Sequence, residues 1–250
     1  EPLAESGNTE AQYRFGRMLE FGAGMTKDLP RAIEWYRKAA ARGHADAMEQ
    51  LGEIYATGEG APRNDAEAAS WFRKAADAGH AAAQYNLGLA YAKGTGVRAD
   101  VPTAIGWFRK SAAQGFAASL AMLGIAYQEG TGVAKDPVLA YANFSLAARS
   151  GQAEFAAKRD AVAATLTPAQ RKAGDYAVNA WTMGEYGAQA VVWQTAINPV
   201  VAFELLARGT WSGAGVLGPE AFPADPFLEL LVEYGSPWAM REETPTPAGA

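Results

Sequence analysis

The sequence predicts an all-α fold, a right-handed α-solenoid of helix-turn-helix repeats followed by a small α/β or helical C-terminal appendage. The first observation is a residue pair that recurs every 36 residues. Its copies are Phe15-Gly16, Leu51-Gly52, Leu87-Gly88 and Leu123-Gly124. The second observation is that other residues keep the same register, among them Gly22, Gly58, Gly94 and Gly130, and Ala32, Ala68, Ala104 and Ala140. A period of this length is typical of stacked repeats in which each unit contacts its neighbours.

The first half of each unit has the spacing of a helix. In the third unit, Ala83, Leu87 and Tyr91 are four residues apart and fall on one face, and Gly94 follows as a stop signal. Gly88 has no side chain, so we expect it to let the second helix of the unit approach closely. We predict that Tyr91 and a tryptophan of that second helix, Trp107, fill the space around it.

The second half of the unit predicts another helix, over residues 101–113. Apolar residues recur along it as a stripe, and Gly115 supplies the left-handed residue that ends it. Each unit is therefore a helix pair that cannot bury its apolar faces alone, and stacking of neighbours completes the core.

These positions together resemble the Sel1-like repeat, a relative of the tetratricopeptide repeat. The third unit matches the repeat pattern at Ala83, Leu87, Gly88, Tyr91, Gly94, Gly96, Val97, Asp100, Ala104, Trp107, Lys110, Ala112 and Gly115. The departures are Leu19 in the first unit, Ser111 in the third, and Asn143 and Leu146 in the fourth. The resemblance implies a solenoid whose first helices line a concave groove that binds partner proteins.

We predict a repeat domain over residues 1–180, with four units at about 11–151 followed by capping helices. At the fifth position of the recurring pair stands Arg159-Asp160, whose charges suit a cap that meets water. Thr167-Pro168 then predicts a helix that runs to about Gly174. The sequence begins with Glu and not Met, so we expect a segment upstream to have been removed. The compartment stays open between periplasmic or secreted and cytoplasmic.

The period disappears beyond about Trp181. Residues 190–195 suggest a short strand, residues 199–207 and 227–234 suggest helices, and residues 243–250 a disordered tail. Over residues 181–242 the chain resembles the C-terminal end of saccharopine and carboxynorspermidine dehydrogenases, at Trp193-Gln194-Thr195, Pro199, Gly209-Thr210-Trp211, Gly215-Val216, Glu220, Phe222, Asp225-Pro226-Phe227, Gly235 and Pro237-Trp238. This resemblance implies, as the alternative function, a part in an oxidoreductase assembly. In that family, however, a nucleotide-binding domain stands where this chain has its repeats.

Composition restricts the possible partners. The 250 residues carry a net charge of −5 and no cysteine, so there is no disulfide framework and no thiolate metal site. The repeats have no basic stripe for phosphates, which argues against nucleic-acid binding. The most apolar run, residues 188–203, is too short and too polar to predict a membrane span. The many large apolar residues of the appendage suggest possible self-association through it.

Two motifs suggest chemistry but lack the context for it. Residues 213–218 spell a dinucleotide fingerprint, yet a predicted helix precedes them and Pro219 follows, so we expect a glycine-rich connector and no cofactor. His44 and His80 stand one period apart between units, without histidines at the matching Phe116 and Gln152. We interpret both as solvated loop residues and not as metal ligands. No catalytic residue is identified, and the chain is predicted to be non-enzymatic.

The positions that do not recur are the candidates for specificity. On each first helix they are spaced by four and lie opposite the recurring residues. We call this set the variable stripe: Tyr13, Arg17 and Phe21; Glu49, Glu53 and Thr57; Tyr85, Leu89 and Lys93; Ala121, Ile125 and Glu129. We predict a non-enzymatic adaptor that binds a protein or peptide along this stripe, with Tyr13 and Tyr85 as exposed anchors, although ordinary solvated surface is the alternative at any one position.

Overall fold

The computed structural model describes residues 2–185, and every regular element in this part of the chain is helical. The chain divides into two compact units, one up to Leu166 and one from Thr167. The first unit contains α1 (Pro2–Glu5), α2 (Thr9–Phe21), α3 (Leu29–Ala40), α4 (Ala45–Thr57), α5 (Asp65–Asp77), α6 (Ala81–Lys93), α7 (Val101–Ala112), α8 (Ala117–Glu129), α9 (Pro137–Ala148) and α10 (Ala153–Ala163). The described part of the second unit is α11 (Pro168–Glu185).

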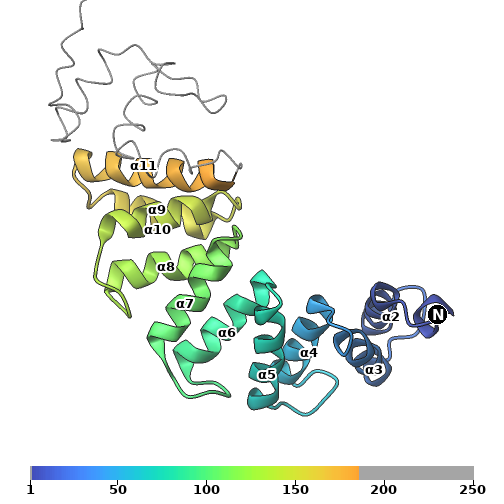
Figure 1. Ribbon diagram of the computed structural model, residues 1–250. Helices are drawn as coiled ribbons and strands as arrows, with labels where there is room; N and C mark the ends of the chain where they lie inside the picture. The colour runs from blue at the N-terminus through green and yellow to red at the C-terminus, as the bar shows by residue number, and fades with distance from the viewer. Residues whose placement is uncertain (1, 186–250) are drawn as a thin grey trace, which may run out of the picture. The chain divides into compact units, whose positions relative to one another are not determined.

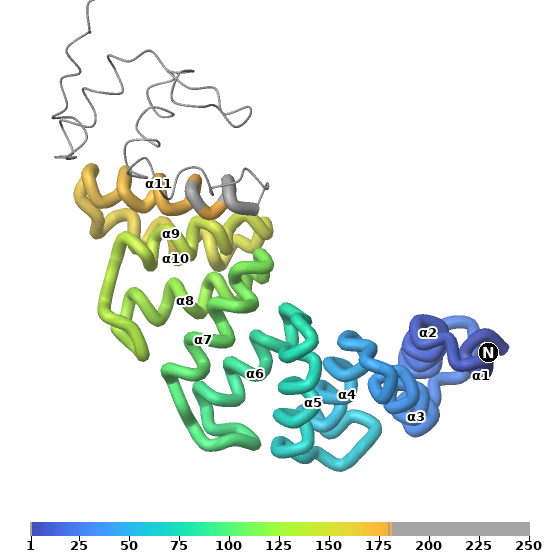
Figure 2. The backbone as a smooth tube through the Cα atoms, in the orientation of Figure 1, coloured from blue at the N-terminus to red at the C-terminus, as the bar shows by residue number. Residues whose placement is uncertain are grey.

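The helices of the first unit pack as four successive pairs, which confirms the predicted α-solenoid repeats (Figure 1). We call them unit one (α2 and α3), unit two (α4 and α5), unit three (α6 and α7) and unit four (α8 and α9). In each unit a first helix, a wide loop and a second helix follow one another, as the tube in Figure 2 traces. The second helix of each unit then packs against the first helix of the next, so the pairs stack continuously.

The ends of the helices have local causes in the sequence. Every first helix stops at a left-handed glycine, of which Gly94 at φ 71° is one. Every second helix begins at an Asp or Asn whose side chain accepts a backbone N–H, as Asp100 does from Thr103 at 3.1 Å. Because these residues satisfy N–H groups that the helix leaves free, the caps fix where each helix starts and stops.

The recurring glycine of each first helix is the closest point of contact inside a pair. A Cβ built on Gly88 would lie 2.6 Å from Cε1 of Phe108, so only glycine fits without a shift. The equivalent contacts are Gly16 with Tyr36, Gly52 with Phe72 and Gly124 with Phe144. The predicted close approach is therefore present, but the ring over Gly88 belongs to Phe108 and not to Trp107. Trp107 packs, partly buried, on the core cluster around Leu87.

Both ends of the four repeat units are covered by a further helix. At the start, α1 places Ala4 in the core, and Gln12 of α2 donates a hydrogen bond to its carbonyl at 3.2 Å. At the far end, Arg159 and Asp160 of α10 pair with each other at 2.8 Å, and Asp160 is exposed.

The helix after Thr167 is longer than predicted. Thr167 and Gln170 form a reciprocal capping box, with Gln170 N 3.2 Å from Thr167 Oγ1 and Thr167 N 3.0 Å from Gln170 Oε1. The helix then passes Gly174, where we expected its end, and continues to Glu185. The predicted strand, helices and glycine-rich connector of the appendage lie outside the described residues. None of the described helices has the length and apolarity that crossing a bilayer requires.

Candidate functional site

The first part of the variable stripe forms an exposed aromatic and cationic ladder on α2. The guanidinium carbon of Arg17 lies 6.0 Å from the ring centre of Tyr13 and 5.5 Å from that of Phe21. Arg17 is exposed, and Phe21 is 64% exposed, more than any other large apolar residue described. A cation held between two rings is a preorganised contact surface, since the quadrupole of each ring attracts the charge.

Tyr13 and Tyr85 differ from the exposed anchors that we expected. Both are only partly buried, and each packs on the residue directly before the following first helix. Tyr13 stacks on His44 with ring centres 4.5 Å apart, and Tyr85 packs on Phe116 at 5.4 Å and on Phe108 at 6.0 Å. Burial accordingly raises the pKa of both phenols. These tyrosines contribute to the contacts between units, so Phe21 is the better exposed anchor.

His44 and His80 are not solvated loop residues. Nδ1 of His44 accepts the backbone N–H of Ala47 at 3.3 Å and caps α4, so Nε2 carries the proton and lies 3.0 Å from Oε2 of Glu10. His80 repeats the arrangement one unit later, capping α6 and facing Asp46 at 3.4 Å. Each histidine therefore links two successive first helices. No set of three possible metal ligands gathers anywhere in residues 2–185.

Glu49 is the member of the stripe whose environment is most unusual. It occupies the register of Tyr13 and Tyr85, yet its residue surface is only 6% exposed. Its carboxylate accepts a hydrogen bond from Gln50 at 2.9 Å, and Asn86 of α6 lies 3.5 Å away. The pKa of Glu49 is raised to about 7, chiefly because the carboxyl group is buried and also because the carboxylate of Glu53, one turn along, repels its charged form.

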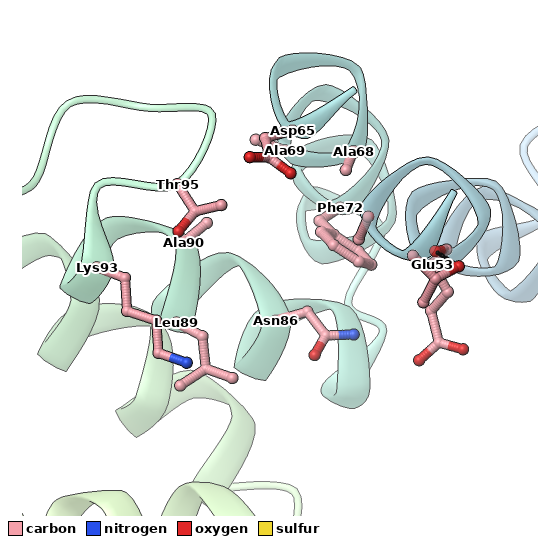
Figure 3. A pocket seen from close by; sticks show the side chains of 12 residues that line it. Glu53, Asp65, Ala68, Ala69, Phe72, Asn86, Leu89, Ala90, Lys93 and Thr95 are labelled. Carbon is pink, nitrogen blue, oxygen red and sulfur yellow. Dashed lines mark hydrogen bonds between the residues drawn. The ribbon is translucent and has the colours of Figure 1, made fainter. Parts of the chain in front are cut away.

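A cleft of about 300 Å³ lies between α4, α5 and α6, and both neighbours of the Glu49 carboxyl group, Glu53 and Asn86, line it (Figure 3). Its floor is apolar and includes Ala68, Ala69 and Phe72 of α5 with Ala90 of α6. The stripe residues Glu53, Thr57, Leu89 and Lys93 also line it, so four of the predicted positions share one cavity. In Figure 3, Glu53 and Lys93 stand on opposite sides of the opening, with Asn86 and Leu89 between them.

The cleft exists because unit two carries a small residue where its neighbours carry a large one. Ala69 occupies the register of Ile33 in unit one and Ile105 in unit three. In those units the isoleucine packs beneath the loop glycine of the next unit, within 3.5 Å of a Cβ built on Gly60 and 3.2 Å of one built on Gly132. Replacing isoleucine by alanine removes these side-chain atoms and leaves the space open.

A second substitution in unit two changes the polarity of the same region. Asp65 takes the place of Leu29 and Val101, at the start of the second helix. Its carboxylate pairs with Arg63 at 2.8 Å, and this guanidinium lowers the pKa of Asp65. The loop at Gly96 lies against the backbone of α5 here, where a Cβ would come within 1.9 Å of the Asp65 carbonyl oxygen. The loop thus closes one end of the cleft without filling it.

The remaining stripe residues stay outside the cleft. Ala121 is buried, Ile125 is partly buried and Glu129 is exposed, all on α8. The residues that sequence reasoning missed are Ala69, Asp65 and Asn86. The first two could have been found from the repeat register, because they are small or charged where the other units are large and apolar.

The model of the Sel1 repeat matches four segments, residues 9–44, 45–80, 81–116 and 117–152, which make up more than half of the chain. The chain belongs to the Sel1 repeat family. These segments coincide with the helix pairs of units one to four and confirm the expected repeat identity. Sel1 repeat proteins are generally scaffolds for protein interaction.

Solved structures support the same conclusion. A Sel1 repeat protein from Oxalobacter formigenes is 36% identical, with a TM-score of 0.58 over 61% of this chain and 62% of that one. A protective antigen of uropathogenic Escherichia coli with an SLR fold is 32% identical, with a TM-score of 0.51 over 78% of this chain and 50% of that one. The chain thus spans about half to three fifths of the length of these structures.

One dehydrogenase shows a short similarity. A carboxyaminopropylagmatine dehydrogenase from Synechocystis is 37% identical over 54 residues, which are 22% of this chain and 14% of that protein. A match that covers so little of the enzyme does not carry its activity to this chain.

Proposed function

We propose that this Sel1 repeat protein is a non-enzymatic scaffold that binds a segment of a partner protein along the variable stripe of its first helices. The observation that carries the proposal is the combination, on one set of helices, of exposed Phe21 and Arg17 with the cleft beside Glu53. Aromatic residues and arginine are enriched among the residues that dominate binding energy, and pockets between stacked helices accept their counterparts. The dehydrogenase alternative has no comparable observation in the described part of the chain.

Site-specific photocrosslinking tests this proposal on the full chain. A benzophenone amino acid placed at position 21 or 89 should form a crosslink to one and the same protein in lysate of the source cells. Position 34 provides the control, because Glu34 is exposed on α3, a second helix that lies outside the stripe. Crosslinks to that protein from position 34 but not from positions 21 and 89 would place the interface elsewhere and refute the proposal.

A further inference from the structure

The cleft between units two and three has an apolar floor and an acidic side. The floor of alanines and Phe72 is apolar, and the volume of the cleft, about 300 Å³, is at the lower end of the range for ligand pockets. This size suits one long side chain better than a drug-sized molecule. Glu53 lines the same cleft as these apolar residues (Figure 3).

The acidic side lacks a cation. Among residues 2–185 neither Glu49 nor Glu53 forms an ion pair, although their carboxyl groups are one helical turn apart and interact with each other. Lys93 also lines the cleft, but on the opposite side of the opening. Two neighbouring carboxylates repel each other, and burial of one of them strengthens the repulsion. A positive group placed at this side would relieve it.

We propose that the cleft binds an arginine or lysine side chain of the partner segment, with the aliphatic stem on the apolar floor and the charged head at Glu53, the acidic residue of α4 that lines the cleft. This inference rests on the proposed function and adds the chemistry of the residue recognised. Both parts of such a side chain are matched, because long basic residues bury their methylene groups while the head keeps polar partners. Arginine and lysine both combine an aliphatic stem with a positive head, so either would fit. The experiment separates such a basic occupant from an acidic or purely apolar one.

The repeat itself supplies the variant that closes the cleft. Ala69→Ile copies Ile33 and Ile105 from the neighbouring units, so isoleucine is already compatible with this register. Ala66→Ile is the matched control, since it adds the same atoms on the same helix at an exposed position. A second filling variant, Ala90→Ile, copies Ile54 of unit two and closes the cleft from α6. Circular-dichroism melts establish that each variant is folded before binding is measured.

The probe is a random dodecapeptide library displayed on phage and selected against the immobilised full chain. Enriched peptides should share a basic residue, and one of them, synthesised, should bind at least 10-fold more weakly to Ala69→Ile and to Ala90→Ile than to Ala66→Ile. Glu53→Gln should also weaken binding several-fold, and the effect should shrink in high salt because it is electrostatic.

Several results would overturn the proposal. One is enrichment of peptides that share no basic residue, and another is equal binding to the filled and control variants. A third is weaker binding to Lys93→Gln together with unchanged binding to Glu53→Gln, which would indicate an acidic occupant. A library that yields no binder would overturn it as well. If Phe21→Ala abolishes binding while Ala69→Ile does not, the scaffold function survives and only the cleft assignment fails.

Discussion

Replacing Glu49 by glutamine should make the repeat region less sensitive to pH and more stable above neutral pH. The groups that interact with Glu49 are the carboxylates of Glu53 and Asp46, the phenol of Tyr13 and the amides of Gln50 and Asn86, and none of them is a cation. Folding therefore favours the protonated, neutral form of this carboxyl group.

The sign and size of the effect follow from this preference. Between pH 4.5 and about 7 the folded chain holds a proton on Glu49 that the unfolded chain has released. The free energy of unfolding should therefore fall as the pH rises through this window and level off above it. At about 1.4 kcal/mol per pKa unit the full shift corresponds to about 3 kcal/mol, and partial access of water to the rim of the cleft reduces this to about 2 kcal/mol.

Urea denaturation at pH 5 and pH 8 measures this directly. From pH 5 to pH 8 the free energy of unfolding of the native chain should fall by about 2 kcal/mol more than that of Glu49→Gln, because a neutral amide has no proton to release. Glu34→Gln, which removes an exposed carboxylate on α3, should keep the pH dependence of the native chain. If Glu49→Gln and Glu34→Gln lose stability in parallel, Glu49 is not the group that titrates and the reasoning is wrong.

Two further predictions concern packing. Gly88→Ala should lower the free energy of unfolding by about 1–3 kcal/mol, because the new methyl group meets the ring of Phe108. Gly106→Ala should raise it by up to about 1 kcal/mol, because a Cβ at this position has no atom within 4 Å and alanine favours a helix more than glycine does. Equal effects at both glycines in urea denaturation would contradict the close contact. Ser111→Ala should lower the free energy of unfolding by about 1–3 kcal/mol, since Ser119 Oγ donates to Ser111 Oγ at 2.7 Å in a buried site and would lose this acceptor. The double variant Ser111→Ala with Ser119→Ala should unfold near the urea midpoint of the native chain, because no hydroxyl group is then left unpaired. A double variant as unstable as the single one would show that the hydrogen bond is not the cause.

Much of the fold could be predicted from the sequence because the repeat fixes many positions at once. The register located the helices, their glycine stops and the close approach at Gly88. It did not tell which of two adjacent aromatic residues covers that glycine. Trp107 and Phe108 point about 100° apart on α7, and only the packing of the helix pair selects Phe108.

The candidate site was harder to predict because its features depend on contacts between units. The periodicity of α4 places Glu49 opposite the core, but Asn86 of the next first helix lies beside it and helps to bury it. The two histidines were misinterpreted for a related reason. Histidine is not among the common N-cap residues, and the acidic partner of His44 lies 34 residues earlier on another helix.

Departures from the repeat are of two kinds, and the difference bears on function. Ser111 and Ser119 both replace alanine, and each compensates the other by a buried hydrogen bond, so this change is complete within the chain. Ala69 and Glu49 also depart from the register, but nothing in the described part fills the space left by Ala69 or neutralises the buried carboxyl group. A protein that keeps an unfilled cleft beside an unpaired acid loses packing and electrostatic stability there. A bound basic side chain would restore both, which is why we place recognition at units two and three and not along the whole stack.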